Sequence, residues 1–285
     1  MVVDVGDFDS AMGDYGRMLG QEPVWLESNA ERRTRSALFP LANMVLEIRG
    51  DSGAAESAAV TETKGLSGLR LACDDVERFA QQLASDGIAA GLRVSEKAER
   101  DDSDDADNAD DADVADGEGA RSWVSTTLDR AASRGISVEL ISDEEGMDRV
   151  YSPAVDPQSA IRALDHVVVF SADAEATRDF YRDLGIRLAL DRTFEKRGVR
   201  LLFFRIAGVT IEIGGRLGVE RQPDGTDRFG GLAWQVLDID AIRSRLLADR
   251  FDVSEIRDGN KAGTRVCTVR EPVHDVPTLL IEPVS

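Results

Sequence analysis

Histidine, cysteine and strand-borne glutamate are the residue types in this chain that could do metal or acid–base chemistry. Of the two histidines, His166 opens the apolar run HVVVF, where an imidazole could bind a metal at the mouth of a site. His274 stands in a turn before the last strand, where we expect it to be exposed to solvent. The two cysteines, Cys73 and Cys267, form no CxxC motif and no disulfide framework, which suits a reducing compartment.

The glutamates stand in a repeated context, because the chain is a tandem duplication. Gly68–Ile88 aligns without gaps on Gly231–Phe251, at an offset of 163 residues. The strand MVLEIRG matches VTIEIGG at an offset of 165, so Glu47 corresponds to Glu212. The first copy carries 23 extra residues late in its second half, where an acidic, low-complexity run lies. We expect this run to be a disordered, solvated loop.

Each copy divides again into two units, each containing one helix followed by strands. Helical spacing of apolar residues predicts four helices, and β-branched, aromatic-rich runs such as HVVVF and RLLFFRI predict the strands. The expected fold is α+β, with four βαβββ modules, two in each of two domains. The predicted helices are Phe8–Leu19, Val76–Ser85, Ala174–Leu184 and Ile239–Ala248. The predicted first domain covers residues 1–145, with modules at 1–50 and 65–142 and the acidic loop at 97–119. The predicted second domain covers residues 161–285, with modules at 161–216 and 228–285. A linker at 146–160 joins the two domains.

Composition narrows the classes of partner. The formal net charge is −20, and the chain holds 34 Asp and 20 Glu but only 4 Lys, which resembles the surface of proteins from salt-loving organisms. This charge argues against nucleic acid or anionic membrane as a partner. We find no apolar run of the roughly 18 residues that a bilayer span needs and no basic signal segment at the start. We therefore expect a cytoplasmic protein, as a monomer or homodimer, that binds neither nucleic acid nor membranes.

The four modules, the opening LDHVVV…FYRDLG and the strand pattern xEIxG resemble the vicinal oxygen chelate superfamily of glyoxalases, bleomycin resistance proteins and dioxygenases. The resemblance implies that each pair of modules forms one glyoxalase-like, curved, barrel-like sheet around a cavity for a small molecule. It also implies four metal-ligand positions in each domain, on the first and last strands of each module. In the second domain these positions hold His166, Glu212, Gly231 and Leu279. Extradiol dioxygenases of the superfamily need two His and one Glu, so Gly231 and Leu279 argue against iron-dependent ring cleavage.

In the first domain the implied ligand positions hold Glu47, Gly68 and Glu139. Strand alternation favours a register in which Asp4 points into the cavity, because the other register would bury its carboxylate against helices. That register aligns Tyr15 with Tyr181 and places the equivalent of His166 immediately before Met1. If a histidine stood there, it would form a glyoxalase-like metal site with Glu47 and Glu139, and one glutamate could move a substrate proton.

Two functions remain open at this point. The first is a lyase or isomerase of glyoxalase or epimerase type that uses one divalent ion (Zn, Ni, Co, Mn and Fe not distinguished) and no nucleotide cofactor. In that enzyme the catalytic residues would be Glu47 and Glu139. The metal ligands would be His166, Glu212, Glu47 and Glu139. The second is a metal-free binding protein of resistance type. In either, Arg70 could bind the carbonyl or carboxylate of the ligand or pair with Glu47 or Glu139, and Gln235 is the residue expected to correspond to it.

Overall fold

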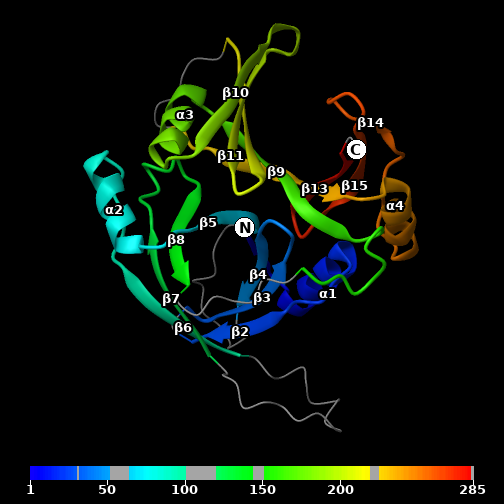
Figure 1. Ribbon diagram of the computed structural model, residues 1–285, viewed down its shortest axis with the longest axis horizontal. Helices are drawn as coiled ribbons and strands as arrows, with labels where there is room; N and C mark the ends of the chain where they lie inside the picture. The colour runs from blue at the N-terminus through cyan, green and yellow to red at the C-terminus, as the bar shows by residue number, and fades with distance from the viewer. Residues whose placement is uncertain (31, 52–63, 101–119, 144–150, 219–224, 284–285) are drawn as a thin grey trace.

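The computed structural model describes residues 1–30, 32–51, 64–100, 120–143, 151–218 and 225–283. Within these residues, the strands form two eight-stranded sheets, one closed into a barrel and one open (Figure 1). The α+β fold of two glyoxalase-like domains is therefore confirmed. The barrel consists of β1 (Val2–Asp4), β2 (Trp25–Asn29), β3 (Thr34–Pro40), β4 (Val45–Asp51), β5 (Gly65–Ala72), β6 (Val94–Arg100), β7 (Ala120–Thr127) and β8 (Ser137–Asp143).

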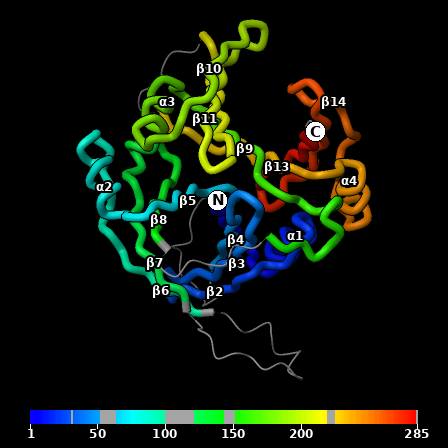
Figure 2. The backbone as a smooth tube through the Cα atoms, viewed as in Figure 1, coloured from blue at the N-terminus to red at the C-terminus, as the bar shows by residue number. Residues whose placement is uncertain are grey.

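The open sheet repeats the same order of elements. Its strands are β9 (Ile161–Ser171), β10 (Arg187–Phe194), β11 (Val199–Ile206), β12 (Val209–Arg216), β13 (Arg228–Val236), β14 (Arg257–Asp258), β15 (Arg265–Val273) and β16 (Val276–Glu282). Figure 2 shows the hairpin of β10 and β11 projecting away from the barrel. We refer to the barrel and its helices as the first domain, and to the open sheet and its helices as the second.

Four α-helices, one for each module, lie among the described residues. They are α1 (Phe8–Leu19), α2 (Val76–Ser85), α3 (Ala174–Asp183) and α4 (Ile239–Ala248). Each begins after an aspartate whose carboxylate accepts hydrogen bonds from backbone N–H groups of the first turn. Such a cap satisfies donors that have no partner inside the helix. In α1, apolar residues at helical spacing, including Phe8, Tyr15 and Leu19, are buried.

Closure distinguishes the two sheets. In the first domain β2 pairs with β6, with Ser28 opposite Glu99, and this pairing joins the two modules into a barrel. In the second domain the outermost strands are β10 and β14, and β14 has only two residues. The strand β6 runs to Arg100, so the loop predicted over 97–119 begins later than expected. Residues 101–119 of that prediction lie outside the described residues.

The pairing register confirms the predicted orientation of the first strand. Val2 lies opposite Glu47 as Val168 lies opposite Glu212, so Asp4 takes the place of Phe170. Asp4 is buried, and both of its carboxylate oxygens accept hydrogen bonds from Arg49 at 2.7 and 3.1 Å. The carboxylate is therefore charge-paired instead of isolated.

Polar contacts dock the two domains against each other. The Asn43 side chain bonds both backbone groups of Leu164, at 2.8 and 3.0 Å. Arg245 of α4 donates to the carbonyl of Met18 at 2.9 Å and so satisfies the end of α1. Arg134 donates to the carbonyl of Gly225 at 2.7 Å. No helix in the described ranges is long and apolar enough to cross a bilayer.

Candidate functional site

The polar centre of the barrel is a guanidinium held between two carboxylates. Arg70 on β5 donates from Nε to Glu139 Oε2 at 2.6 Å, and its Nη1 pairs with Glu47 Oε2. Glu47 comes from β4 and Glu139 from β8, where it lies directly opposite Arg70 across the parallel pair. All three side chains are largely buried. The sequence prediction that Arg70 pairs with Glu47 or Glu139 is confirmed, because it pairs with both.

A wider ionic network lines the barrel around this centre. Glu47 also accepts from the Ser36 hydroxyl at 3.0 Å, and Glu139 pairs with Arg32 at 2.8 Å. The described network contains four guanidinium groups and five carboxylates. These are Arg32, Arg49, Arg70 and Arg121, and Asp4, Glu27, Glu47, Glu96 and Glu139.

The ionic network contains carboxyl groups whose pKa values are shifted in opposite directions. Burial acts to raise the pKa of Glu47 and of Glu139. The Arg70 guanidinium, together with Arg49 at Glu47 and Arg32 at Glu139, more than offsets it, so both pKa values lie below their usual range. Burial raises the pKa of Glu27 to about 7, and the partner Arg121 only partly offsets this. Glu47 and Glu139 are therefore carboxylates at neutral pH, whereas Glu27 holds its proton more readily.

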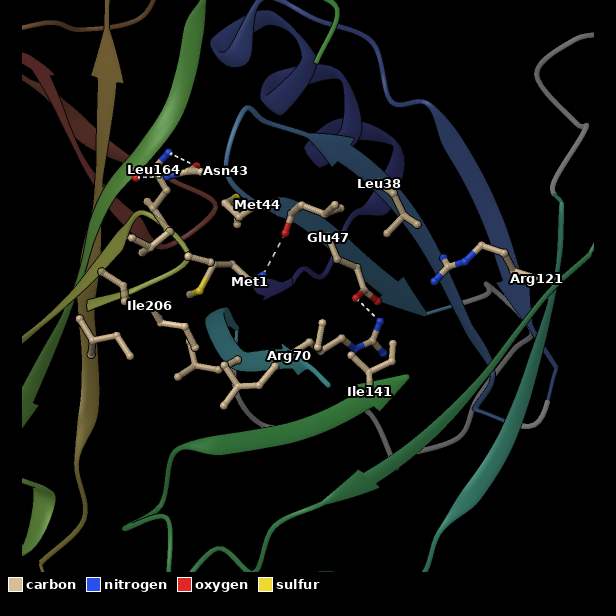
Figure 3. A pocket seen from close by; sticks show the side chains of 18 residues that line it. Met1, Leu38, Asn43, Met44, Glu47, Arg70, Arg121, Ile141, Leu164 and Ile206 are labelled. Atoms are coloured by element: carbon tan, nitrogen blue, oxygen red, sulfur yellow. Dashed lines mark hydrogen bonds and ion pairs between the residues drawn. The ribbon is translucent and has the colours of Figure 1, made fainter. Parts of the chain in front are cut away.

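Two cavities meet at Arg70. The larger, of about 280 Å³, lies between the barrel and the second domain, and Figure 3 shows it with Arg70 and Glu47 at one side and Leu164 and Ile206 at the other. Its walls are mainly apolar. The smaller, of about 150 Å³, is lined by Arg32, Arg70 and Glu139 among others. The Arg70 side chain therefore separates an apolar cavity between the domains from a polar cavity inside the barrel.

The second domain arranges its polar residues differently. The antiparallel register of β9 and β13 shifts between Leu164 and His166, so Asp165 is an extra residue on β9. Asp165 Oδ1 lies 2.8 Å from His166 Nδ1, and Gln235 Nε2 donates to Asp165 Oδ2 at 3.0 Å. His166 Nε2 lies 3.9 Å from Glu212 Oε2. His166 and Glu212 are brought together as predicted, but Asp165 was missed, since strict alternation places it on the opposite face.

Burial raises the pKa of Glu212, and His166 only partly offsets it. The two remaining ligand positions of this domain offer no donor. Leu279 is apolar, and Gly231 has a φ of +141°. A Cβ atom there would lie 2.5 Å from the carbonyl oxygen of Pro277, so the backbone itself excludes a side chain.

Two expectations need correction. Ala233, and not Gln235, corresponds to Arg70, because Ala233 lies opposite Leu279 as Arg70 lies opposite Glu139. The alignment of the repeats had already implied this correspondence. His274 is not a free solvent-exposed histidine, since its Nε2 lies 2.9 Å from Asp14 Oδ2 of the first domain. The docking of α1 against the second domain accounts for this contact.

Sequence reasoning also missed most of the barrel network. Glu27, Glu96, Arg32 and Arg121 were not predicted as interior residues. Along β6, the buried residues Glu96 and Ala98 alternate with exposed neighbours. Strand alternation is therefore the signal that could have placed Glu96 inside the barrel. No comparable pattern marks Arg32, which follows β2 in a turn.

The donor sets do not fit a divalent ion well. Among the described residues, no group of three or more His, Cys, Asp or Glu side chains could hold a metal. In the barrel, the guanidinium of Arg70 lies between the two glutamates, where a metal cation would have to displace it. In the second domain, His166 and Glu212 supply two donors, fewer than the three or four that protein sites usually give a transition metal.

Comparison with known proteins agrees with this geometry. A sequence model described as the glyoxalase/bleomycin resistance protein/dioxygenase superfamily matches residues 165–268. A triple mutant of 4-hydroxymandelate synthase from Streptomyces coelicolor superposes with a TM-score of 0.65 and 17% identity, covering 99% of this chain and 90% of that one. The resemblance to the vicinal oxygen chelate superfamily is confirmed.

Methylmalonyl-CoA epimerase from Mycobacterium tuberculosis also matches, at a TM-score of 0.37 and 23% identity, over 46% of this chain and 94% of the epimerase. Among curated proteins, none matches this sequence. At 17% identity, the likeness to the synthase shows a shared fold and not a reaction.

Proposed function

We propose that this chain binds a small organic molecule with an oxygen-bearing group in the cavity between the barrel and the second domain. We also propose that the barrel uses no metal ion to bind it. The observation that carries the proposal is the guanidinium of Arg70 between Glu47 and Glu139. A buried positive charge already pairs with both of the carboxylates that the family resemblance assigns to a metal. A divalent ion would meet repulsion from that charge, and the ion pairs would have to break first.

The geometry of the glutamates gives less support to a glyoxalase or epimerase reaction. A general base works best with a pKa near the working pH and with an oxygen free to accept the proton. The pKa values of Glu47 and Glu139 are lowered, and Arg70 bonds one oxygen of each. We therefore place binding first, with Arg70 positioned to bind the ligand's oxygen. Substrate binding by Gln235 stays a prediction, as do the cytoplasmic location and the oligomeric state.

Two measurements on the purified chain test the proposal. Elemental analysis after passage over a chelating column should find no stoichiometric divalent ion. Titration with small carbonyl and carboxylate compounds, followed by NMR shifts of the cavity residues, should find binding that the cavity-filling variant Ile206→Trp abolishes. The exposed Leu190→Trp is the matched control and should bind as the wild type does. One tightly held ion per chain that is lost in Glu47→Gln would overturn the proposal.

A further inference from the structure

The polar groups that line the cavity between the domains offer more donors than acceptors. Arg70 and Arg121 present guanidinium groups, which only donate. The ammonium group of Met1 also lies in the lining and donates to the neutral carbonyl of Val45 at 3.0 Å. Among the described residues that line the cavity, Glu47 alone carries a carboxylate. A bound molecule therefore meets three cationic groups and one anionic group at the surface of the wall.

The side-chain oxygens of this lining are already engaged. Glu47 accepts from Ser36 on Oε1 and from Arg70 on Oε2. The Asn43 amide bonds both backbone groups of Leu164. A ligand ammonium group would bring donors to oxygens that already have partners, and a buried donor without an acceptor is costly. The lining therefore favours a ligand whose polar atoms are acceptors.

Arg70 keeps donors for such a ligand. A guanidinium has five N–H groups, and Glu139 and Glu47 take the Nε–H and one N–H on Nη1. Because Arg70 lines the cavity, its remaining N–H groups can donate to a ligand oxygen there. A carboxylate oxygen adds the attraction of opposite charges to this bond, whereas a ketone oxygen does not.

Two further carboxylates lie behind this wall. Glu139 and Glu27 pair with Arg70 and Arg121 at 2.6 and 2.9 Å, but neither glutamate lines the cavity. With Glu47 they balance the three cationic groups in number, while the cations face the ligand. Burial raises the pKa of Glu27 to about 7, so this group is partly protonated at neutral pH and the balance moves toward positive charge.

The rest of the wall suits an apolar body. The barrel contributes Leu38 and Ile141, and the second domain contributes Leu164, Ile206 and Val209. Burial of apolar surface against such walls drives binding in proportion to the area removed from water. A volume of about 280 Å³ is roughly twice that of the engineered 150 Å³ cavity that holds benzene. One ring with a short substituent therefore fills the space.

Resting on the proposed function, we infer that the cavity selects carboxylates, with a single ring or short branched chain, over ketones and amines of the same shape. The family resemblance leaves carbonyl and carboxylate ligands equally open, and the cationic lining of this cavity decides between them.

A matched set of probes tests the inference. At pH 8, 3-phenylpropionate is an anion, 4-phenyl-2-butanone is neutral and 3-phenylpropylamine is a cation, and the three have similar shapes. Titrations followed by NMR should give the carboxylate a dissociation constant at least about tenfold lower than that of the ketone, with the amine weakest. Ile206→Trp should abolish carboxylate binding, with Leu190→Trp as the matched surface control. Met44→Trp serves as a second filling variant if the first one does not fold.

A charge variant tests the physical cause. Ala207 lines the cavity, is exposed and has a φ of +48°, a conformation that Asp and Asn tolerate better than most residues. Ala207→Asp adds a carboxylate to the lining, and the matched control Ala207→Asn adds a side chain of the same shape without charge. Relative to Ala207→Asn, Ala207→Asp should weaken carboxylate binding several-fold and leave ketone binding unchanged. Equal carboxylate affinities in the two variants contradict the charge argument.

The outcomes separate this inference from the proposed function. A ketone or an amine that binds the wild type as tightly as the carboxylate, and loses binding in Ile206→Trp, overturns the inference but leaves the proposed function intact. Failure of all three probes to bind overturns both.

Discussion

In the first domain Arg70 faces Glu139 across β5 and β8, whereas in the second domain Ala233 faces Leu279 at the same positions of β13 and β16. The glutamate on the neighbouring strand is present in both, as Glu47 and Glu212. One copy thus carries an ion pair where the other carries two apolar side chains. Charge and partner have changed together, as expected when an isolated buried charge is costly.

The pKa values of Glu47 and Glu212 show the effect of this difference. Burial acts to raise the pKa of Glu47, but Arg70, Arg49 and Ser36 together lower it, whereas the pKa of Glu212 is raised by burial with only His166 to offset it. The pKa values at equivalent positions on equivalent strands are therefore shifted in opposite directions. The environment of a carboxylate, and not its place in the repeat, sets its chemistry.

The largest expected effect comes from removing the shared cation. Arg70→Met leaves Glu47 and Glu139 buried without their main partner, and we expect it to lower the free energy of unfolding by about 3–5 kcal/mol. Urea unfolding at neutral pH measures this. Arg270→Met, which breaks an exposed pair with Asp252, is the matched control and should change stability by less than about 1 kcal/mol. A similar loss in both variants would contradict the role given to Arg70.

Replacing the ion pair of the first domain by the apolar pair of the second domain tests the comparison directly. Arg70→Ala combined with Glu139→Leu recreates the pair Ala233 and Leu279, so it should be more stable than Arg70→Ala alone. The physical reason is that Arg70→Ala alone leaves both Glu47 and Glu139 without their shared cation, whereas the double variant leaves only Glu47 in that state. A double-mutant cycle in urea measures the coupling. Simple additivity of the two losses would contradict the pairing.

Arg70→Ala alone should also reveal a cation site that the wild type lacks. Without the guanidinium, Glu47 and Glu139 can share a divalent ion. We expect millimolar Mn²⁺ or Zn²⁺ to raise the melting temperature of this variant and not that of the wild type. At tenfold excess over the dissociation constant the gain is about 1.4 kcal/mol. Glu139→Gln in the same background removes one ligand and should abolish the gain.

The raised pKa of Glu27 makes a pH prediction. Its folded value of about 7 lies above the ordinary 4.5, so its contribution to stability is full below 4.5 and is lost as pH rises to 7. Relative to Glu27→Gln, which cannot ionise, the wild type should therefore lose stability over this window. Melting temperatures of both proteins from pH 5 to 8 measure the difference, and a constant difference would contradict the shift.

The smallest effect is expected in the second domain. His166→Ala should leave the metal content of the purified chain unchanged, because no third metal-binding side chain joins His166 and Glu212 in the part of the chain that the structure describes. Elemental analysis of wild type and variant gives the answer. If the wild type keeps about one divalent ion per chain and the variant loses it, the second domain is a metal site and the comparison drawn above is wrong.

The sequence alone determined the repeat, the four modules and the faces of most strands. An internal offset fixes which residues correspond, and alternation along a strand fixes which face them. Together with the family resemblance, these local rules placed Glu47, Arg70 and Glu139 in one cavity and oriented Asp4. They also set the helix starts, because each aspartate cap acts on the turn beside it.

Only the tertiary structure decided the partners and the cavities. The extra residue Asp165 on β9 turns toward His166 because the register with β13 shifts there, and no local pattern announces the shift. By its sequence position alone, Arg70 could have bound a ligand or a glutamate. It pairs with Glu47 and Glu139 because the closed barrel brings β4 and β8 close to β5. The cavity of about 280 Å³ takes its walls from both domains, so it exists only once they dock. Contacts between residues distant in the sequence are set by the packing of whole elements, which neither alternation nor repeat offset specifies.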